Sequence, residues 1–365
     1  MIKILCFLTG CMALLVLVCG TAVAWDSPLE VTINYIKFNH TTGSSTNDAL
    51  DLKKYYSTTI VAPEWVGPDS IQAFAYIMNQ SSRTIKAQFS HEDEHEDINT
   101  MHIQATYTGS NPIGNVPLTE VNFGYTQQSD ETTFTTSGTV PNSVRDYSYY
   151  WHWTVNKVNG VTQSPGISIG NTYHFCYSLL RQPSTDVFSD GKPWSIILEK
   201  ACSWAYGENT DVGVATEIAK SIYAICDGYV DEQQYGTSEG SIDVEDFFDA
   251  IDQSNVIFSC YDSANIFNSF TEAVGCTTTC CFIQKSGYDF QTNPIKIVGS
   301  DESSTEYWAN HKYGMIGINA YDPILKYNDS GNWIVPTNKR QDLYYYDVFY
   351  SLGIGQTDYS HVTPY

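Results

Sequence analysis

The chain has 365 residues, a formal net charge of −23 and only 16% charged residues. Phosphate binding needs clusters of Lys or Arg, and the sequence contains none, so its composition argues against nucleic acid as a partner. Aromatic residues make up 14% of the chain, which is typical of a folded extracellular protein and not of a disordered one. The length predicts about two domains of roughly 150 residues each.

The first 24 residues have the pattern of a secretory signal peptide. Lys3 is followed by an almost wholly apolar segment at 4–19, and Ala22-Val23-Ala24 is an A-x-A-type cleavage site. We expect cleavage before Trp25, which removes Lys3 as the one charged residue of the segment. No later segment is apolar for long enough to cross a bilayer, so the mature chain is predicted to be secreted or held at the cell surface, without a membrane span.

Residues 25–180 are predicted to form an all-β sandwich of the immunoglobulin-like type. Short segments alternate apolar with polar residues, and glycine-rich or asparagine-rich turns separate them. Asn159-Gly160, between Val158 and Val161, is the strongest hairpin signal. The segments with the clearest period of two are 31–36, 71–77, 102–107 and 151–155.

Residues 181–365 change character and predict an α+β domain. Apolar residues recur at helical spacing, with Pro193 at a plausible first helical position and Asp243 or Ser241 as a cap. A helix that starts at Cys260 should end near Gly275. The predicted helices are 194–205, 212–226, 244–251 and 260–275, and the predicted strands are 278–284, 295–299, 306–311, 315–321 and 343–349.

Cys260 has the surroundings that a thiol nucleophile needs. Ser259 is a suitable N-cap, which places Cys260 in the first helical turn, where unpaired N–H groups and the helix dipole favour a thiolate. His311 on a following strand can form the ion pair and protonate a leaving amine, and Asp322 can fix its tautomer. The order Cys, His, Asp therefore predicts a catalytic triad.

This set of residues resembles the transglutaminase-like superfamily, which has a papain-like core. The match covers roughly residues 190–325 and is strongest at 260–275. The resemblance implies Cys260 as nucleophile, His311 as base and Asp322 as the residue that orients the base. The sequence departs from the family's frequent Gly-x-Cys and His-x-Trp patterns, because it has Phe258-Ser259-Cys260 and His311-Lys312-Tyr313.

An acyl-transfer site also needs donors for the oxyanion. The backbone N–H of Cys260 is the natural first donor. Trp204 and Tyr206 are the aromatic residues considered for the second. No cofactor and no metal are expected at this site.

The mature chain contains seven cysteines, an odd number. If Cys260 is free, the other six suffice for three disulfides with about fifteen possible connectivities. Zinc binding by Cys276, Cys280 and Cys281 is a weaker alternative, because no Cys-x-x-Cys pair is present.

The sequence therefore predicts a secreted transglutaminase-like cysteine hydrolase that acts on peptide or carboxamide bonds through a thioester acyl-enzyme. Its expected partner is a protein or peptide substrate, or a cell-surface polymer. Two alternatives stay open: a catalytically inactive relative that binds peptide or glycan, and a surface adhesion protein whose function lies in the β-domain. The sequence leaves open the choice between hydrolysis and cross-linking and the oligomeric state.

Overall fold

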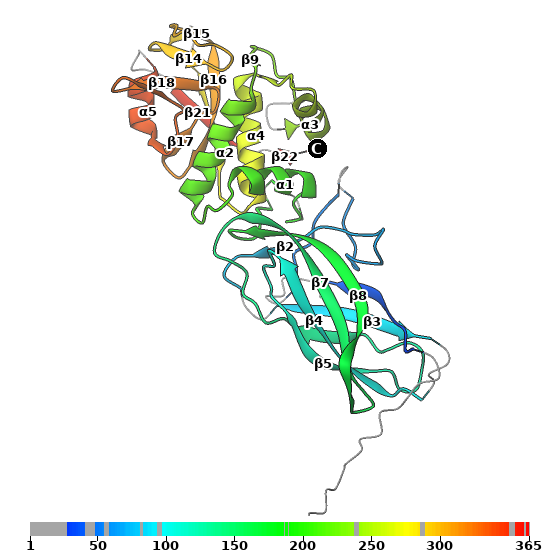
Figure 1. The fold of residues 1–365 in the computed structure, drawn as a ribbon. Coiled ribbons are helices and arrows are strands. Elements are labelled where there is room, and N and C mark those ends of the chain that lie inside the picture. The colour runs from blue at the N-terminus through cyan, green and yellow to red at the C-terminus, as the bar shows by residue number, and fades with distance from the viewer. Residues whose placement is uncertain are drawn as a thin grey trace, which may run out of the picture.

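The computed structural model has a β-rich N-terminal part and a mixed C-terminal part, which together form an elongated molecule (Figure 1). The predicted signal peptide lies outside the described residues. No helix among the residues that the structure describes is long and apolar enough to cross a membrane. The described residues are 28–40, 48–54, 58–80, 83–92, 97–185, 187–188, 190–236, 241–284, 289–349, 355–360 and 363–364.

Two sheets make up the N-terminal part. The smaller sheet is antiparallel and has the order β1-β3-β6, with strands Val31–Lys37, Thr84–His91 and Thr132–Thr135. The larger has the order β2-β8-β7-β4-β5, with strands Phe74–Ile77, Val161–Leu179, Arg145–Val158, Thr100–Gly109 and Val116–Asn122. The β-rich character predicted for residues 25–180 is confirmed.

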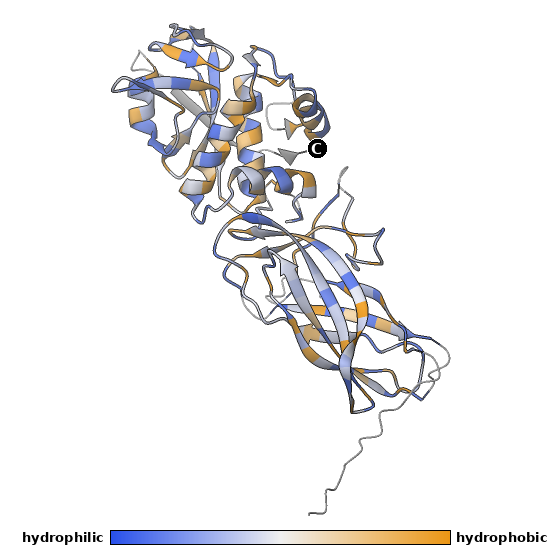
Figure 2. Ribbon diagram, viewed as in Figure 1, coloured by the Kyte–Doolittle hydropathy of each residue, from blue (hydrophilic) through white to orange (hydrophobic). Residues whose placement is uncertain are grey.

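The two sheets share one apolar core. Successive residues of β3 and β7 alternate between buried and more exposed positions, as expected for strands with one face in the core. In Figure 2 the strands of this part carry both hydrophobic and hydrophilic residues, with many pale residues of intermediate hydropathy between them. Phe89 of the smaller sheet packs against Trp153 of the larger, with ring centroids 5.7 Å apart.

The longest hairpin of this part turns where the sequence predicts it. Val158 pairs with Val161 across Asn159-Gly160. Both turn residues have positive φ, 47° for Asn159 and 79° for Gly160. A two-residue turn of this hand suits the twist of the flanking strands, which explains why this pair of residues was a reliable signal.

Four of the predicted helices are present, each within one or two residues of its expected bounds. Thr210 caps α2 and Asp243 caps α3, which settles the choice between Asp243 and Ser241. Pro193 precedes α1 by two residues, so the prediction that it occupies the first helical position was wrong. The helices are α1 Ser195–Trp204, α2 Asp211–Ile225, α3 Val244–Asp252 and α4 Cys260–Ala273.

Helix α4 is the centre of the C-terminal part (Figure 1). It contacts α1, α2 and strand β16, and nearly every one of its residues is buried. Gly314 of β16 allows this contact, because a Cβ there would lie 2.1 Å from the ring of Phe267. The sheet beside α4 has the order β20-β17-β16-β12-β21, with strands Lys339–Arg340, Asn319–Tyr321, Asn310–Ile316, Thr279–Gln284 and Gly355–Ser360.

Short strands complete this part. They pair as β13 with β15, β18 with both β14 and β19, β11 with β9, and β10 with β22. Their bounds are Phe290–Gln291 (β13), Tyr307–Trp308 (β15), Ile295–Ile297 (β14), Leu325–Asp329 (β18), Asn332–Ile334 (β19), Ile257–Phe258 (β11), Gly228–Tyr229 (β9), Ser241–Ile242 (β10) and Thr363–Pro364 (β22).

Three strand predictions in this region were wrong. The expected strand 315–321 is divided by a turn at 317–318, between β16 and β17. The segment 343–349 lies mostly in a helix, α5 Gln341–Val348, in which Tyr344 and Val348 are buried one turn apart while Tyr346 is 76% exposed. The expected strand 306–311 divides between β15 and β16, so His311 belongs to the longer strand that follows. Aromatic residues are common in strands, which is why the segment 343–349 was predicted as one. The buried residues Tyr344 and Val348 are four positions apart, which is the spacing of one face of a helix.

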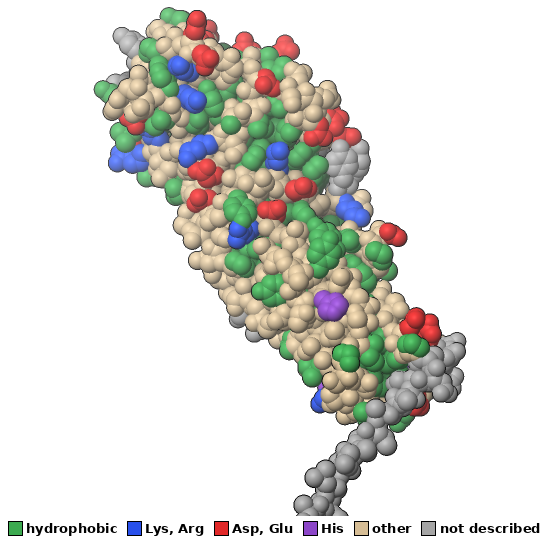
Figure 3. Space-filling model, in the orientation of Figure 1, with side chains coloured by type: hydrophobic (Ala, Val, Ile, Leu, Met, Phe, Trp, Pro, Cys, Tyr) green, Lys and Arg blue, Asp and Glu red, His purple; other side chains and the backbone are tan. Residues whose placement is uncertain are grey.

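The N-terminal and C-terminal parts pack against each other through a shared apolar cluster. One apolar cluster contains Leu52 and Tyr177 from the N-terminal part together with residues of α1, α2 and α4. The Leu180 N–H donates to the Val274 carbonyl (3.0 Å), and Gly275 follows with a φ of 90°. On the face in Figure 3, charged side chains gather over the C-terminal part, while the middle of the N-terminal part carries few.

Candidate active site

The start of α4 is held by a capping box. The Ser259 hydroxyl accepts a hydrogen bond from the Asp262 N–H (3.2 Å), and the Asp262 carboxylate accepts one from the Ser259 N–H (2.9 Å). Cys260 is therefore fixed in the first turn, as the sequence predicts. The Ser259 and Asp262 side-chain oxygens thus cap the N-terminal end of α4 by accepting from backbone N–H groups. The other N–H groups of the first turn and the helix dipole favour a negative charge on the Cys260 sulfur.

Asp262 also attaches a neighbouring loop to the helix start. Its two carboxylate oxygens accept from the backbone N–H groups of Gln234 and Tyr235, each at 2.9 Å. Its side chain is 1% exposed, so these bonds replace the water that a carboxylate would otherwise bind. The loop before α3 is thereby fixed beside Cys260.

His311 and Asp322 form a buried pair. His311 lies on β16 opposite Ile283 of β12, and Asp322 directly follows β17. The two groups are 2.8 Å apart between His311 Nε2 and Asp322 Oδ2. A carboxylate can only accept, so Nε2 carries the proton and Nδ1 is the atom available for proton transfer.

Cys260 lies beside the His311 ring. Burial lowers the pKa of His311, but the charge of Asp322, its hydrogen bond and the neighbouring Cys260 sulfur raise it to about 9. The Nδ1 atom is buried without a hydrogen bond of good geometry, even though the sulfur is close enough to raise the pKa of the ring. Cys260 is 5% exposed and His311 is fully buried.

Two aromatic residues that the sequence did not single out fix this pair. The Tyr344 hydroxyl donates to Asp322 Oδ2 at 2.6 Å. The Trp308 ring stacks on the His311 ring, with centroids 4.4 Å apart and an angle of 14°. Tyr344 was noticed only as part of an aromatic cluster, and its role depends on the unexpected helix α5. Trp308 precedes His311 by three residues, and this closeness in the chain was the one feature of the sequence that could have indicated its contact with His311.

Tyr229 is a further polar side chain near the sulfur. It lies on β9, opposite Phe258 of β11, just before the capping box. Burial, then the charge of Cys260, raises the pKa of its hydroxyl, and Asp231 and Asp322 raise it further. The strand pairing places this hydroxyl near the start of α4, but 31 positions before Cys260 in the chain, so no local sequence pattern indicates it.

Trp204 and Tyr206 do not lie at the site. Trp204 stacks on Phe270 at 5.1 Å, and Phe270 is ten residues along α4 from Cys260, roughly 15 Å at 1.5 Å per residue. Tyr206 lies under the Arg145 guanidinium, 4.2 Å from its ring centroid, where the two parts of the molecule meet. Their predicted role as oxyanion donors was wrong because α1 packs near the C-terminal end of α4.

All seven described cysteines are free, so the three expected disulfides are not formed. Burial raises the pKa of each of the six apart from Cys260: Cys176, Cys202, Cys226, Cys276, Cys280 and Cys281. The part of the chain that the structure describes contains no group of three His, Cys, Asp or Glu side chains that could hold a metal ion. Cys276, Cys280 and Cys281 therefore do not form the zinc site considered as an alternative.

Comparisons of the chain with protein-family models, curated proteins and solved structures gave no match.

Proposed function

We propose that this protein is a secreted cysteine hydrolase that cleaves peptide or carboxamide bonds with Cys260, His311 and Asp322. The observation that carries the proposal is the buried His311 ring, which hydrogen-bonds Asp322 through Nε2 and faces the Cys260 sulfur at a capped helix start. A raised pKa at His311 beside a thiol favours a thiolate–imidazolium pair, the form of such a site that is ready to react.

The first half of the reaction forms the acyl-enzyme. The Cys260 sulfur attacks the carbonyl carbon, and the electron pair of the C=O bond moves to oxygen. The Cys260 N–H at the helix start stabilises this oxyanion. His311 Nδ1 gives its proton to the leaving amine, the C–N bond breaks, and a thioester remains.

The second half regenerates the thiolate. His311 Nδ1 takes a proton from water, the hydroxyl oxygen bonds to the thioester carbon, and the C–S bond breaks to release a carboxylic acid. Asp322 holds the ring in the required tautomer through both halves. Hydrolysis is proposed over cross-linking because it needs no site for a second substrate.

The second oxyanion donor proposed here is the Tyr229 hydroxyl. It replaces Trp204 and Tyr206, which lie elsewhere. Tyr229 is half-buried, and Cys260 and Asp231 are both close enough to its hydroxyl to raise its pKa. An oxyanion at the thioester carbon would compete with Asp231 for this proton.

At the level of the fold, we propose a transglutaminase-like architecture for residues 181–365 and an immunoglobulin-like sandwich before it. Support comes from a cysteine-headed central helix packed on an antiparallel sheet that carries the histidine. The same packing explains why a nucleophile and its base, 51 positions apart in the chain, lie side by side.

Alkylation of the native protein tests the nucleophile, and the other six cysteines serve as internal controls. We expect iodoacetamide at neutral pH to label Cys260 first, because burial raises the pKa of the other six thiols. His311→Gln should slow the labelling of Cys260 by about tenfold or more. Peptide mapping gives the rate at each cysteine. Labelling of Cys260 no faster than of Cys281, or recovery of Cys260 in a disulfide, would contradict the proposal.

A turnover assay tests the reaction. Glutamine-containing peptides are incubated with residues 25–365, with and without a primary amine, and products are identified by mass spectrometry. We expect a carboxylic acid product that Cys260→Ala does not form. An amine adduct in place of the acid would assign cross-linking, and no product with folded, alkylatable enzyme would favour the binding-protein alternative.

A further inference from the structure

The N-terminal part contains a shallow pocket that the proposed catalysis does not use. It has a volume of about 580 Å³ and lies where the connection between β5 and β6 crosses β3. Its lining is polar and uncharged apart from two carboxylates, and it includes no Lys, Arg or His. The lining residues are Gln88, Tyr125, Thr126, Gln127, Gln128, Ser129, Asp130 and Glu131.

The connection is fixed to the sheet, so the pocket is already formed. The His91 N–H donates to the Gln127 carbonyl (2.9 Å), and the Ser129 N–H donates to the Phe89 carbonyl (2.9 Å). The Phe89 N–H donates in return to the Ser129 hydroxyl (3.0 Å). A preformed site binds a ligand without the entropy cost of ordering a loop.

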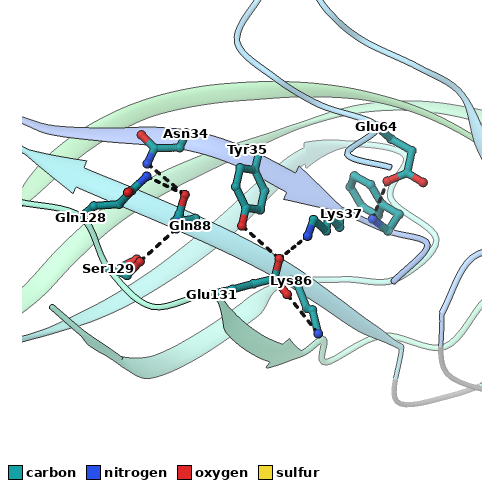
Figure 4. A network of polar contacts seen from close by, with 10 residues as sticks. Asn34, Tyr35, Lys37, Glu64, Lys86, Gln88, Gln128, Ser129 and Glu131 are labelled. Carbon is teal, nitrogen blue, oxygen red and sulfur yellow. Dashed lines mark hydrogen bonds and ion pairs between the residues drawn. The ribbon is translucent and has the colours of Figure 1, made fainter. Parts of the chain in front are cut away.

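A row of side-chain amides borders the pocket (Figure 4). Gln88 accepts from Gln128 Nε2 at 2.8 Å and from Asn34 Nδ2 at 3.4 Å, and donates to the Ser129 carbonyl at 3.2 Å. Each amide has two donor hydrogens and two acceptor lone pairs, more than these bonds use. Neighbouring amides can therefore both donate to and accept from a ligand hydroxyl.

The charge at the pocket is largely neutralised. Glu131 accepts from Tyr35 and pairs with Lys37 and Lys86, and these contacts lower its pKa to about 2 against the effect of burial (Figure 4). Its two oxygens are thus already engaged by Tyr35, Lys37 and Lys86. Asp130 keeps one oxygen bonded to Asn122 Nδ2 at 3.1 Å and offers acceptor capacity beside the amides.

Tyr125 adds an exposed ring. It is 64% exposed and has a φ of 63°, a left-handed conformation that is unfavourable for a residue with a Cβ and costs of order 1 kcal/mol. A large ring held in this conformation at the edge of a polar pocket is well placed to cover the apolar face of a ligand. Strained residues of this kind occur often at ligand sites.

We propose that this pocket binds a neutral saccharide. Sugar hydroxyls both donate and accept, which matches amides and a carboxylate, and the C–H face of a pyranose matches a tyrosine ring. A phosphate or another anion would find no cation in the lining, and an apolar ligand would bury unsatisfied amides. The site is independent of Cys260, and it would hold the enzyme on a glycan or glycoprotein surface.

Titration with neutral hexasaccharides tests the proposal. Cellohexaose, maltohexaose, xylohexaose and chitohexaose are added to residues 25–365 carrying Cys260→Ala, and binding is followed by calorimetry and NMR. We expect at least one to bind saturably at millimolar concentration or below. Tyr125→Asn keeps a residue that tolerates the left-handed backbone and should weaken binding about tenfold. Gln128→Ala should weaken it by a similar factor.

Tyr150→Ala is the matched control. Tyr150 is 49% exposed on the larger sheet and contacts Tyr173, outside the pocket, so its loss should leave the affinity unchanged. Failure of all four sugars to bind, equal binding by the Tyr125→Asn variant, or binding of sulfated oligosaccharides alone would overturn the proposal.

Discussion

His311 dominates the electrostatics of the site because it is fully buried yet favours the charged form. Burial alone would lower its pKa, and Asp322 and Cys260 outweigh that effect. The pKa of His311 therefore depends on where the Asp322 carboxylate lies. The Tyr344 hydroxyl donates to its Oδ2, and the Ile324 N–H donates to its Oδ1 at 3.3 Å. The charge state of His311 therefore also depends on Tyr344 and Ile324, through their contacts with Asp322.

The raised pKa of His311 predicts how stability depends on pH. A folded pKa of about 9 against the ordinary 6.5 favours folding by roughly 3 kcal/mol below pH 6.5. This contribution is lost as the pH rises through about 9, because the folded protein then gives up the proton it held more tightly. We expect the free energy of unfolding, measured by urea titration, to fall over this range.

Asp322→Asn provides the control for that measurement. Without the carboxylate charge the pKa of His311 should drop, so the variant should lose less stability than the native chain between neutral and alkaline pH. An equal slope in both proteins would contradict the assignment of the pair. The same variant should lower kcat by about a thousandfold or more, as expected when the tautomer of a catalytic imidazole is no longer fixed.

Tyr344→Phe tests whether orientation of Asp322 matters to the reaction. Loss of one hydrogen bond to a charged group should cost about 1.5 kcal/mol or more, roughly tenfold in kcat/KM. Tyr346→Phe lies on the same helix with its side chain 76% exposed and should have no effect. Equal activity of the two variants in the peptide assay would mean that Tyr344 is not a positioning residue.

At the residue scale, the sequence was sufficient to expect Cys260, His311 and Asp322 near one another, because each belongs to a local pattern: a cap, a strand and a strand end. Their catalytic role stays a prediction. It was insufficient for Tyr344, Trp308 and Tyr229, because their contacts arise from packing between elements distant in the chain. The oxyanion prediction failed for the same reason. Trp204 is the last residue of α1, but α1 contacts α4 near Phe270 and not near Cys260.

At the scale of the elements, the first turn of α4 determines where Cys260 lies. The Ser259 hydroxyl accepts from the Asp262 N–H, and the Ser259 N–H donates to the Asp262 carboxylate. This capping box fixes the position of Cys260. Thr210, Asp243 and Ser259 cap α2, α3 and α4, and their residue types are those preferred at this position. Helices α1 and α5 have no side-chain cap; α1 was still predicted within one residue at each end, whereas α5 was predicted as a strand.

Removal of the cap should affect both stability and reactivity. Ser259→Ala should cost about 1 kcal/mol of unfolding free energy and slow the alkylation of Cys260, because the first turn loses its alignment. Thr210→Ala removes the equivalent cap of α2, where the hydroxyl accepts from the Gly213 N–H at 3.1 Å. It should cost a similar amount of stability without slowing alkylation. Parallel loss of thiol reactivity in both variants would indicate general loosening and not a role for the cap.

At the scale of the molecule, the two predicted domains share packing that the sequence did not indicate. Residues of the N-terminal part enter the apolar cluster of the C-terminal part. The Leu180 N–H donates to the Val274 carbonyl, and the Arg181 side chain donates through Nε to the Gly275 carbonyl. The change of periodicity that the sequence shows near residue 180 coincides with the end of β8 at Leu179. The packing of the two parts was not predictable, because it depends on contacts between segments nearly a hundred residues apart.

Gly275 is the position at which this junction can be tested. Its φ is 90°, and a Cβ there would lie 2.4 Å from the Arg181 carbonyl oxygen. Gly331 has a φ of 96° and no heavy atom within 4 Å of the same added atom. Alanine at either position carries the cost of a left-handed backbone, about 1 kcal/mol, but only Gly275→Ala must also move the chain that joins the two parts.

We therefore expect Gly275→Ala to destabilise by about 2 kcal/mol or more beyond Gly331→Ala in urea unfolding. The native chain should unfold in one calorimetric transition, since a shared apolar cluster couples the two parts. Gly275→Ala should separate that transition into two, with alkylation of Cys260 following the less stable one. If both alanine variants unfold alike and in one step, the close approach of Arg181 and Gly275 does not couple the β-rich part to α4.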